Sequence, residues 1–212
     1  MIGSHIRKCG PVEDKPFTDY EMEIPKVNEL LFPVLDEVAA EKMHDYMLSA
    51  AREGDSVGGI LETVVVGMPT GVGEPWFDTM ESMLAHALFA VPAVKGVEFG
   101  EGFRFAEMKG SQANDAFEVK DGKVVTKTNH NGGINGGITN GMPIRFQTCI
   151  KPTPSIYKKQ ETVNLETMQN EILQIQGRHD PAIIHRARVV VDSMTAIVLA
   201  DMLALRFGTD WL

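Results

Sequence analysis

The sequence TNHNGGINGGITNGMPIRFQTCIKPTPS, residues 128–155, says more about the fold than any other stretch of the chain. Five of the ten residues from 132 to 141 are glycine, arranged as a doubled Gly-Gly-Ile. Such a cluster indicates positive φ angles, or a close approach by another backbone or a ligand, because glycine is otherwise entropically costly to order. Residues 144–150 predict a strand, and a lysine, two prolines and two hydroxyl side chains follow it at 151–155. We expect a site for an anionic ligand; the alternative is a tight sheet corner without one.

Composition limits the class of protein. The chain of 212 residues, 43% hydrophobic and 23% charged, is long enough to bury a globular core. Its formal net charge of -9 argues against nucleic acid, which needs clustered Lys and Arg. No apolar run is long enough for a membrane span, and no secretory signal appears at the start. Cys9 and Cys149 show neither metal nor disulfide spacing, and the histidines and acids lack ligand spacing, so the cytoplasm and no metal are predicted.

The first half alternates strand and helix patterns. Residues 1–6 resemble the end of a strand, and the polar, proline-bearing stretch that follows resembles a loop. Apolar residues at helical spacing predict a helix that begins near 28–32 and ends at Gly54. Strands are predicted at 60–66, 94–99 and 103–109, a connection at 67–75, and a second helix at 77–89.

The second half repeats this mixture. A charged excursion turns at Asp121-Gly122, and a polar extended segment covers 156–163. A long closing helix is predicted with Asp180 as N-cap, Pro181 in its first turn and Gly208 at its C-cap. Its expected apolar face comprises Ala187, Val190, Val191, Met194, Ile197, Val198, Met202 and Leu205. Because strands and helices interleave without strict alternation, the predicted class is α+β rather than doubly wound.

Four blocks, which cover nearly the whole chain from residue 54 onward, resemble the chorismate synthase family. The third and fourth are specific, whereas one Gly-Gly-Ile alone is weak. The blocks are GDSVGG (54–59) with GMP (67–69) and GEP (73–75); PAVKGVE (92–98) with GF (102–103) and GSQ (110–112); residues 129–155; and GRHDP (177–181).

The resemblance implies a lyase that forms chorismate from 5-enolpyruvylshikimate 3-phosphate by a 1,4-elimination of phosphate. It also implies a requirement for reduced FMN without net redox change, an association with NADP, a β-α-β sandwich and a homotetramer. In the family the flavin is thought to lend electron density transiently as phosphate leaves. The family's flavin-binding positions correspond here to Gln112, Ala113, Gly136, Lys151, Pro152, Thr153, Pro154, Ser155 and Arg178.

The chemistry of these residues fits the implied roles. Gly136 permits close backbone approach, Lys151 offers a point charge and Arg178 a planar fork for phosphate. Arg178 also precedes the expected N-terminus of the last helix, whose dipole favours an anion. The alternatives are a solvated charge at Lys151 and a structural salt bridge at Arg178. His130 and His179 invite acid–base roles, although a hydrogen-bonded structural histidine is the alternative for both.

One departure from the family pattern concerns the start. The family's Gly-Glu-Ser-His-Gly, Arg-Pro-x-His and Arg-Ser-Ser motifs have no counterpart here, so the residues proposed as proton donors are unknown for this chain. We therefore expect residues 1–212 to be the C-terminal part of a chorismate synthase domain, with 1–27 as a strand end and loop and 28–212 as the main α+β body. The enzyme reading has one alternative: a catalytically incompetent fragment or truncated scaffold that keeps the fold and the oligomer surface.

Overall fold

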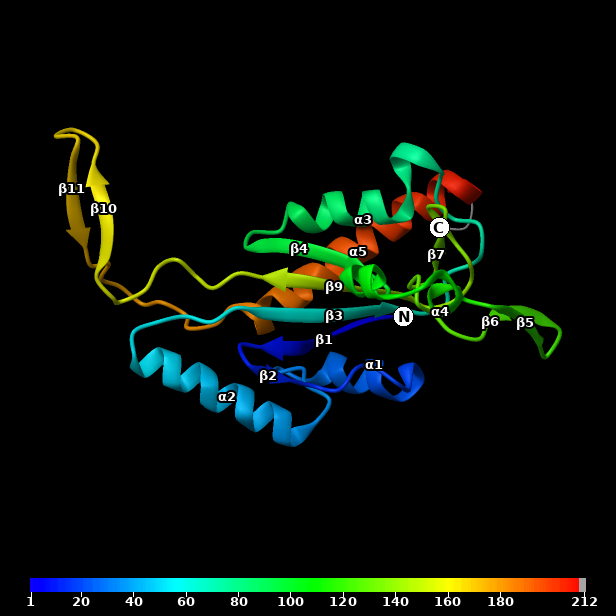
Figure 1. Ribbon diagram of the computed structural model, residues 1–212, viewed down its shortest axis with the longest axis horizontal. Helices are drawn as coiled ribbons and strands as arrows, with labels where there is room; N and C mark the ends of the chain where they lie inside the picture. The colour runs from blue at the N-terminus through cyan, green and yellow to red at the C-terminus, as the bar shows by residue number, and fades with distance from the viewer. Residues whose placement is uncertain (210–212) are drawn as a thin grey trace.

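A five-stranded antiparallel sheet forms the centre of the computed structural model, which describes residues 1–209 (Figure 1). The strand order is β2-β1-β3-β9-β4, so β9 enters between two strands that precede it in the sequence. The pairing of β3 with β9 is regular, from Gly59 opposite Ile150 to Val65 opposite Ile144. The strands are β1 (Ile2–Cys9), β2 (Val12–Glu13), β3 (Gly59–Val65), β4 (Val94–Phe99) and β9 (Ile144–Ile150).

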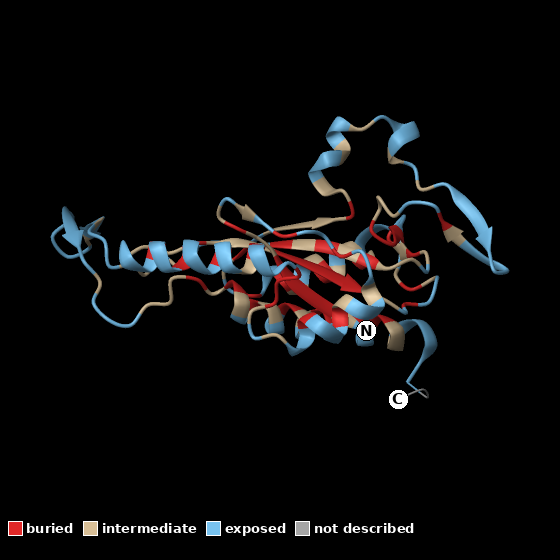
Figure 2. Cartoon of the chain, turned by 90° about the horizontal axis from the view of Figure 1, so that it is seen from below, coloured by how far each residue is buried: buried red, intermediate tan, exposed pale blue. Residues whose placement is uncertain are grey.

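Helices cover the two faces of this sheet unequally. Residues of α2 (Glu37–Arg52), α3 (Met80–Phe89) and α5 (Ile184–Phe207) join Leu61 and Phe146 of the sheet in the main core. On the opposite face, α1 (Tyr20–Glu29) packs Ile24 and Val27 against Val64 in a smaller core. Figure 2 shows the buried residues concentrated in the sheet and on the inner sides of the helices.

The α+β class predicted from the sequence is confirmed, and the sheet with α3 and α5 supplies one β and one α layer. The strands expected at 60–66, 94–99 and 144–150 are present as β3, β4 and β9. The charged excursion forms the hairpin β5 (Phe117–Lys120) and β6 (Lys123–Thr126), with positive φ at both Asp121 and Gly122. The hydrophobic pattern was therefore a reliable guide to β3, β4 and β9.

The expectation for residues 1–27 was wrong in its secondary structure. These residues contain the full-length strand β1, which pairs with β3, and most of helix α1. The next helix begins at Glu37 rather than near 28–32, because the Asp36 carboxylate accepts the Ala39 N–H at 2.8 Å and caps it there. Leu31, which lies near the predicted start of that helix, is exposed.

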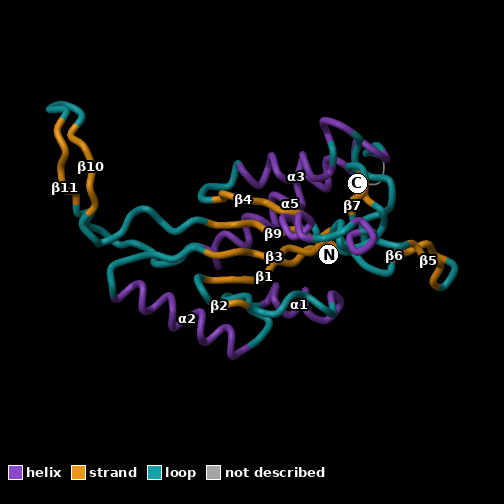
Figure 3. Tube along the Cα trace, in the orientation of Figure 1, coloured by secondary structure: helices purple, strands orange, loops and turns teal. Residues whose placement is uncertain are grey.

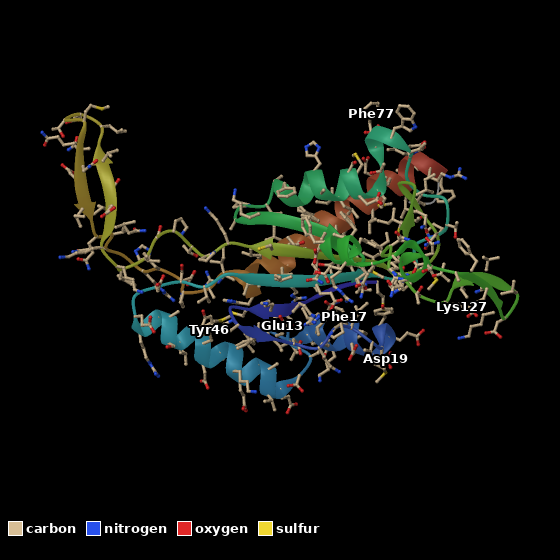
Figure 4. The ribbon with its side chains drawn as sticks, viewed as in Figure 1. Glu13, Phe17, Asp19, Tyr46, Phe77 and Lys127 are labelled. Carbon is tan, nitrogen blue, oxygen red and sulfur yellow. The ribbon has the colours of Figure 1, made fainter. Side chains whose placement is uncertain are left out.

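The strand expected at 103–109 was also wrong. A 3-10 helix occupies Gly102–Glu107, and the short helix α4 (Gly110–Ala113) follows. Gly100 and Gly102 both have positive φ, which turns the chain out of the sheet before a strand can continue. Similarly, α3 begins at Met80 because Thr79 caps it. Before it, a 3-10 turn leaves Phe77 at the outer edge of the molecule (Figure 4).

The closing helix differs from expectation at its start. It begins at Ile184, its N-cap is Ile183 without a side-chain bond, and Asp180 instead accepts a hydrogen bond from Arg186 at 2.7 Å. The predicted C-cap is confirmed, because Gly208 has φ 76° and donates to Ala204 O at 2.8 Å. Three residues of the expected apolar face are exposed, namely Val190, Ile197 and Leu205.

Two further hairpins lie outside the main sheet. β10 (Gln160–Asn164) and β11 (Gln169–Leu173) form an arm that projects from one end of the molecule (Figure 1). All of β11 is exposed. The short pair β7 (Ile134–Asn135) and β8 (Ile138–Thr139) lies within the glycine-rich stretch at the opposite end.

A buried histidine joins β1 to β3 on the α1 face. His5 Nδ1 lies 2.9 Å from Asp14 Oδ2, and His5 Nε2 lies 2.8 Å from Glu62 Oε2. All three residues are buried. Burial alone lowers the pKa of His5, but its hydrogen bonds to the carboxylates of Asp14 and Glu62, together with their negative charges, outweigh burial and raise that pKa. We refer to His5, Asp14 and Glu62 as the buried charge triad.

Candidate functional site

The residues at 151–155 continue β9 beyond its last ladder pair. Lys151 N–H donates to Ala93 O at 2.9 Å, and the following proline has no N–H with which to extend the sheet. Ser56 Oγ then donates to Thr153 O at 2.6 Å, which fixes the extended segment from the other side. Gly58 is required here, because a Cβ would stand 2.5 Å from Ile150 O.

Tyr157, which follows this segment in the sequence, contacts both neighbours of Arg178. The Tyr157 hydroxyl donates to Gly177 O, and its ring meets that of His179 edge-on with centroids 4.9 Å apart. Arg178 and Lys151 are both exposed, and within residues 1–209 neither side chain has an ion-pair or hydrogen-bond partner. Within residues 1–209 the charges of both side chains are thus uncompensated.

Two buried polar atoms in the same region lack a partner within the described chain. They are Thr153 Oγ1 and His179 Nε2. Buried polar groups are normally hydrogen-bonded, so each such atom calls for a specific explanation. A phosphate oxygen would accept from the threonine hydroxyl, while Lys151 and Arg178 would neutralise its charge. The residues at this end of β9 therefore fit the phosphate of FMN or of a substrate.

The start of α5 does not contribute in the way that the sequence predicted. Because the helix begins at Ile184, Arg178 lies six residues before it rather than beside its first turn. The macrodipole acts only within the first turn, so it gives no support to an anion at Arg178. An anion at Arg178 would therefore be attracted by side chains and not by the helix dipole.

Gln112 and Ala113 lie at the other end of β9. Both belong to α4, where the Gln112 Oε1 accepts the Lys109 N–H at 3.0 Å. Ala113 O lies 3.2 Å from His130 Nδ1, which connects α4 to the start of the glycine-rich stretch. At this same end, the backbone of Arg145, the second residue of β9, accepts a hydrogen bond from the Gly100 N–H and donates one to Gly132 O.

The glycine cluster is mostly explained by packing within the chain. All five of its glycines have positive φ. At Gly132, Gly133 and Gly137 a Cβ would come within 3 Å of backbone atoms, and at Gly141 it would come within 3 Å of a threonine hydroxyl. Gly136 differs, because nothing lies within 4 Å of its Cβ position. The structural alternative thus accounts for four of the five, and open space remains only beside the glycine that the family pattern assigns to the flavin.

The predicted residues therefore form two groups, which we name by their ends of β9. The Lys151 end comprises residues 151–155 and Arg178; the Gly136 end comprises Gln112, Ala113 and Gly136. A seven-residue strand separates them, which is about 20 Å at about 3.4 Å per residue. Figure 3 shows α4 and β7 at one end of the sheet and the approach to β10–β11 at the other.

Sequence reasoning missed Asp115, which organises the Gly136 end. Its carboxylate accepts the backbone N–H groups of His130 at 2.7 Å and Asn131 at 2.9 Å, and the Thr128 hydroxyl at 2.7 Å. Its proximity in sequence to Gln112 and Ala113 was the available signal. No comparable signal existed for the buried charge triad, whose members come from three separate segments.

Other properties bear on the class of protein. A cleft of about 400 Å³ lined by Glu74, Asp78 and Arg206 contains none of the predicted flavin residues. Within residues 1–209, no group of three or more His, Cys, Asp or Glu side chains is placed to hold a metal. The same residues include no helix with the length and apolarity that crossing a membrane requires.

The fold and these two groups define an α+β protein with polar strand ends suited to an anionic ligand. Comparison with known proteins is specific: the family model described as chorismate synthase matches residues 1–204. The chain belongs to the chorismate synthase family.

Individual relatives agree. The chain is 49% identical over 205 residues to chorismate synthase of Thermococcus gammatolerans and 50% identical over 205 residues to that of Pyrococcus abyssi. Each match covers 97% of this chain and 56% of the relative, so the chain spans about half the length of the curated relatives it matches. A solved chorismate synthase crystal structure superposes with a TM-score of 0.79 at 28% identity, over 99% of this chain and 58% of the other.

Proposed function

We propose that this chain supplies the flavin- and phosphate-binding half of a chorismate synthase, a cytoplasmic lyase. The reaction would be the 1,4-elimination of phosphate from 5-enolpyruvylshikimate 3-phosphate. The carrying observation is the Lys151 end: two exposed cationic side chains without partners in residues 1–209, together with the buried and unsatisfied Thr153 hydroxyl. Because the chain spans about half of its relatives' length, we propose that turnover also needs residues outside the matched half.

The chain's own residues would bind and orient the cofactor. Lys151 and Arg178 attract the phosphate, Thr153 donates a hydrogen bond to it, and the prolines on either side of Thr153 keep that hydroxyl in place. Gly136 leaves room for a flat ring to approach the backbone. Reduced FMN, when bound, would supply electron density to the substrate as its phosphate departs.

The separation of the two ends supports a shared site. Because about 20 Å of β9 lies between them, we propose that one flavin meets the Lys151 end of one subunit and the Gly136 end of another in a homotetramer. Mixing Gln112→Ala and Lys151→Ala variants tests this idea. In a mixed tetramer, the intact Lys151 end of a Gln112→Ala subunit can meet the intact Gly136 end of a Lys151→Ala subunit. Recovery of FMN binding in the mixture supports sharing; two defects that persist unchanged on mixing refute it.

FMN titration followed by flavin fluorescence tests the binding proposal directly. Lys151→Ala removes one charged hydrogen bond, worth about 1.5–3 kcal/mol, which corresponds to a rise in Kd of roughly 10- to 150-fold. Lys159→Ala is the matched control, since Lys159 is also exposed and lies on the same segment. Equal affinity in the Lys151 variant and the control would remove the support for the proposed phosphate site.

A further inference from the structure

His130 stands at the entrance of the glycine-rich stretch with one ring nitrogen facing two oxygens. Its Nδ1 lies 3.2 Å from Ala113 O and 3.3 Å from Asp115 Oδ1. Both atoms are hydrogen-bond acceptors, so this geometry is satisfied only when Nδ1 carries hydrogen. In the neutral ring the lone pair must then lie on Nε2.

Asp115 is held firmly enough to enforce that choice. Its side chain is 3% exposed, and it accepts hydrogen bonds from Thr128, from the His130 N–H and from both the backbone and the side chain of Asn131. Burial alone raises the pKa of Asp115, but these hydrogen bonds outweigh it and lower that pKa. The carboxylate therefore remains ionised, and an ionised carboxylate cannot donate to Nδ1.

The second nitrogen of His130 is available. The side chain is 24% exposed, and no partner for Nε2 is recorded in residues 1–209. His130 lies at the Gly136 end, because its Nδ1 contacts Ala113 O. Ala113 is one of the positions that the family pattern assigns to the flavin.

We propose that Asp115 and His130 form a carboxylate–imidazole pair that presents Nε2 as a hydrogen-bond acceptor for an N–H group of the bound flavin ring. Asp115 is the positioning residue, since it acts through His130. This inference rests on the flavin site proposed above and adds to it a ligand-contacting residue outside the matched flavin positions. No proton is transferred in this role; the His130 imidazole orients the flavin.

The first test measures the tautomer of His130 in the chain without any ligand. Two-bond nitrogen–proton correlation NMR at pH 8 is expected to show hydrogen on Nδ1. Asp115→Asn is expected to shift the population toward hydrogen on Nε2, because the anionic acceptor is gone. A native His130 with hydrogen on Nε2 overturns the proposal, and an unchanged tautomer in the Asp115 variant overturns the positioning role.

The second test uses FMN as the probe. Asparagine can keep a donor near the Nδ1 position but has no counterpart of Nε2, so His130→Asn separates a structural role from a ligand contact. We expect its thermal midpoint to stay close to that of the native chain while Kd for FMN rises about three- to tenfold. His86→Asn, at an exposed position of α3, is the control.

The outcomes distinguish this inference from the proposed function. If the native chain binds FMN and His130→Asn binds it equally well, the His130 contact is refuted and the flavin site stands. If the native chain binds no FMN, the proposed flavin site fails and the inference fails with it. A lower thermal midpoint together with the affinity loss would assign His130 a structural role and overturn the inference.

Discussion

The buried charge triad offers the sharpest test of how this fold is held together. Replacing His5 by glutamine keeps a polar side chain of similar size but removes the positive charge between Asp14 and Glu62. The side chains of the three residues are 0–2% exposed, so water cannot replace the lost partner. Removing one member of a buried ion pair costs about 3–5 kcal/mol, because the remaining charge is left uncompensated.

Glutamine can still donate one hydrogen bond to one carboxylate, so we expect a loss of about 3 kcal/mol in the free energy of unfolding at pH 7. For a chain of this size, about 2–4 °C per kcal/mol gives a fall in Tm of about 6–12 °C. Urea unfolding and a thermal scan measure both quantities. His44→Gln, at an exposed position of α2, should stay within about 0.5 kcal/mol of the native chain.

The pH dependence supplies an independent check with a definite sign. The pKa of His5 is raised above its usual 6.5 in the folded chain, so its contribution to stability is complete below 6.5. That contribution is lost as the pH rises through the folded value. The native free energy of unfolding should therefore decline above pH 6.5, and this part of the decline should be absent in His5→Gln. A destabilisation under about 1 kcal/mol, or identical pH profiles for the two chains, would refute the reasoning.

Three other predictions use matched positions. Gly58→Ala should lower the free energy of unfolding, measured in urea, by about 1–3 kcal/mol, because its Cβ would meet backbone. Gly96→Ala, with only an ordinary contact at 3.4 Å, should cost less than half as much, and equal losses would contradict the packing described. Gly136→Ala should lower stability by only about 1–2 kcal/mol, which is the strain of a positive φ at alanine. It should also weaken FMN binding, and an unchanged Kd would argue against an approach of the flavin ring to this glycine. Iodoacetamide at pH 8 should label the exposed Cys149 quickly and the buried Cys9, whose pKa burial raises to about 11, only on unfolding; equal labelling rates would count against the fold around Cys9.

Much of the fold was predictable because buried strands carry their own signal. The run at 60–66 is apolar and β-branched, and it forms β3 almost residue for residue. Helix starts were less predictable, because one capping side chain can move them by several residues. Asp36 caps α2 through the Ala39 N–H, whereas Asp180 looked equally suitable and instead pairs with Arg186. The deciding factor is tertiary contact, which the local sequence does not contain.

The candidate site was predictable as a set of residues but not as an arrangement. Family motifs identified Lys151, Gly136 and Arg178, and the strand predicted at 144–150 already separated Gly136 from Lys151. No sequence pattern indicated which end of that strand Gln112 would join. Likewise, glycine density predicted a ligand site, whereas the structure assigns most of those glycines to backbone packing. Only the environment of each Cβ separates the two explanations, and that environment is a property of the folded chain.

The position of β9 between β3 and β4 also constrains how the chain assembles on the ribosome. β9 is synthesised after both of its neighbours, so β4 has no strand partner until the whole glycine-rich stretch has emerged. Until then the facing edges of β3 and β4 present unpaired backbone groups, which are prone to pair with other chains. If synthesis stalled after β4 and before β9, the nascent chain would therefore be prone to aggregate. A holdase chaperone would be needed longest during the synthesis of the residues between these two strands.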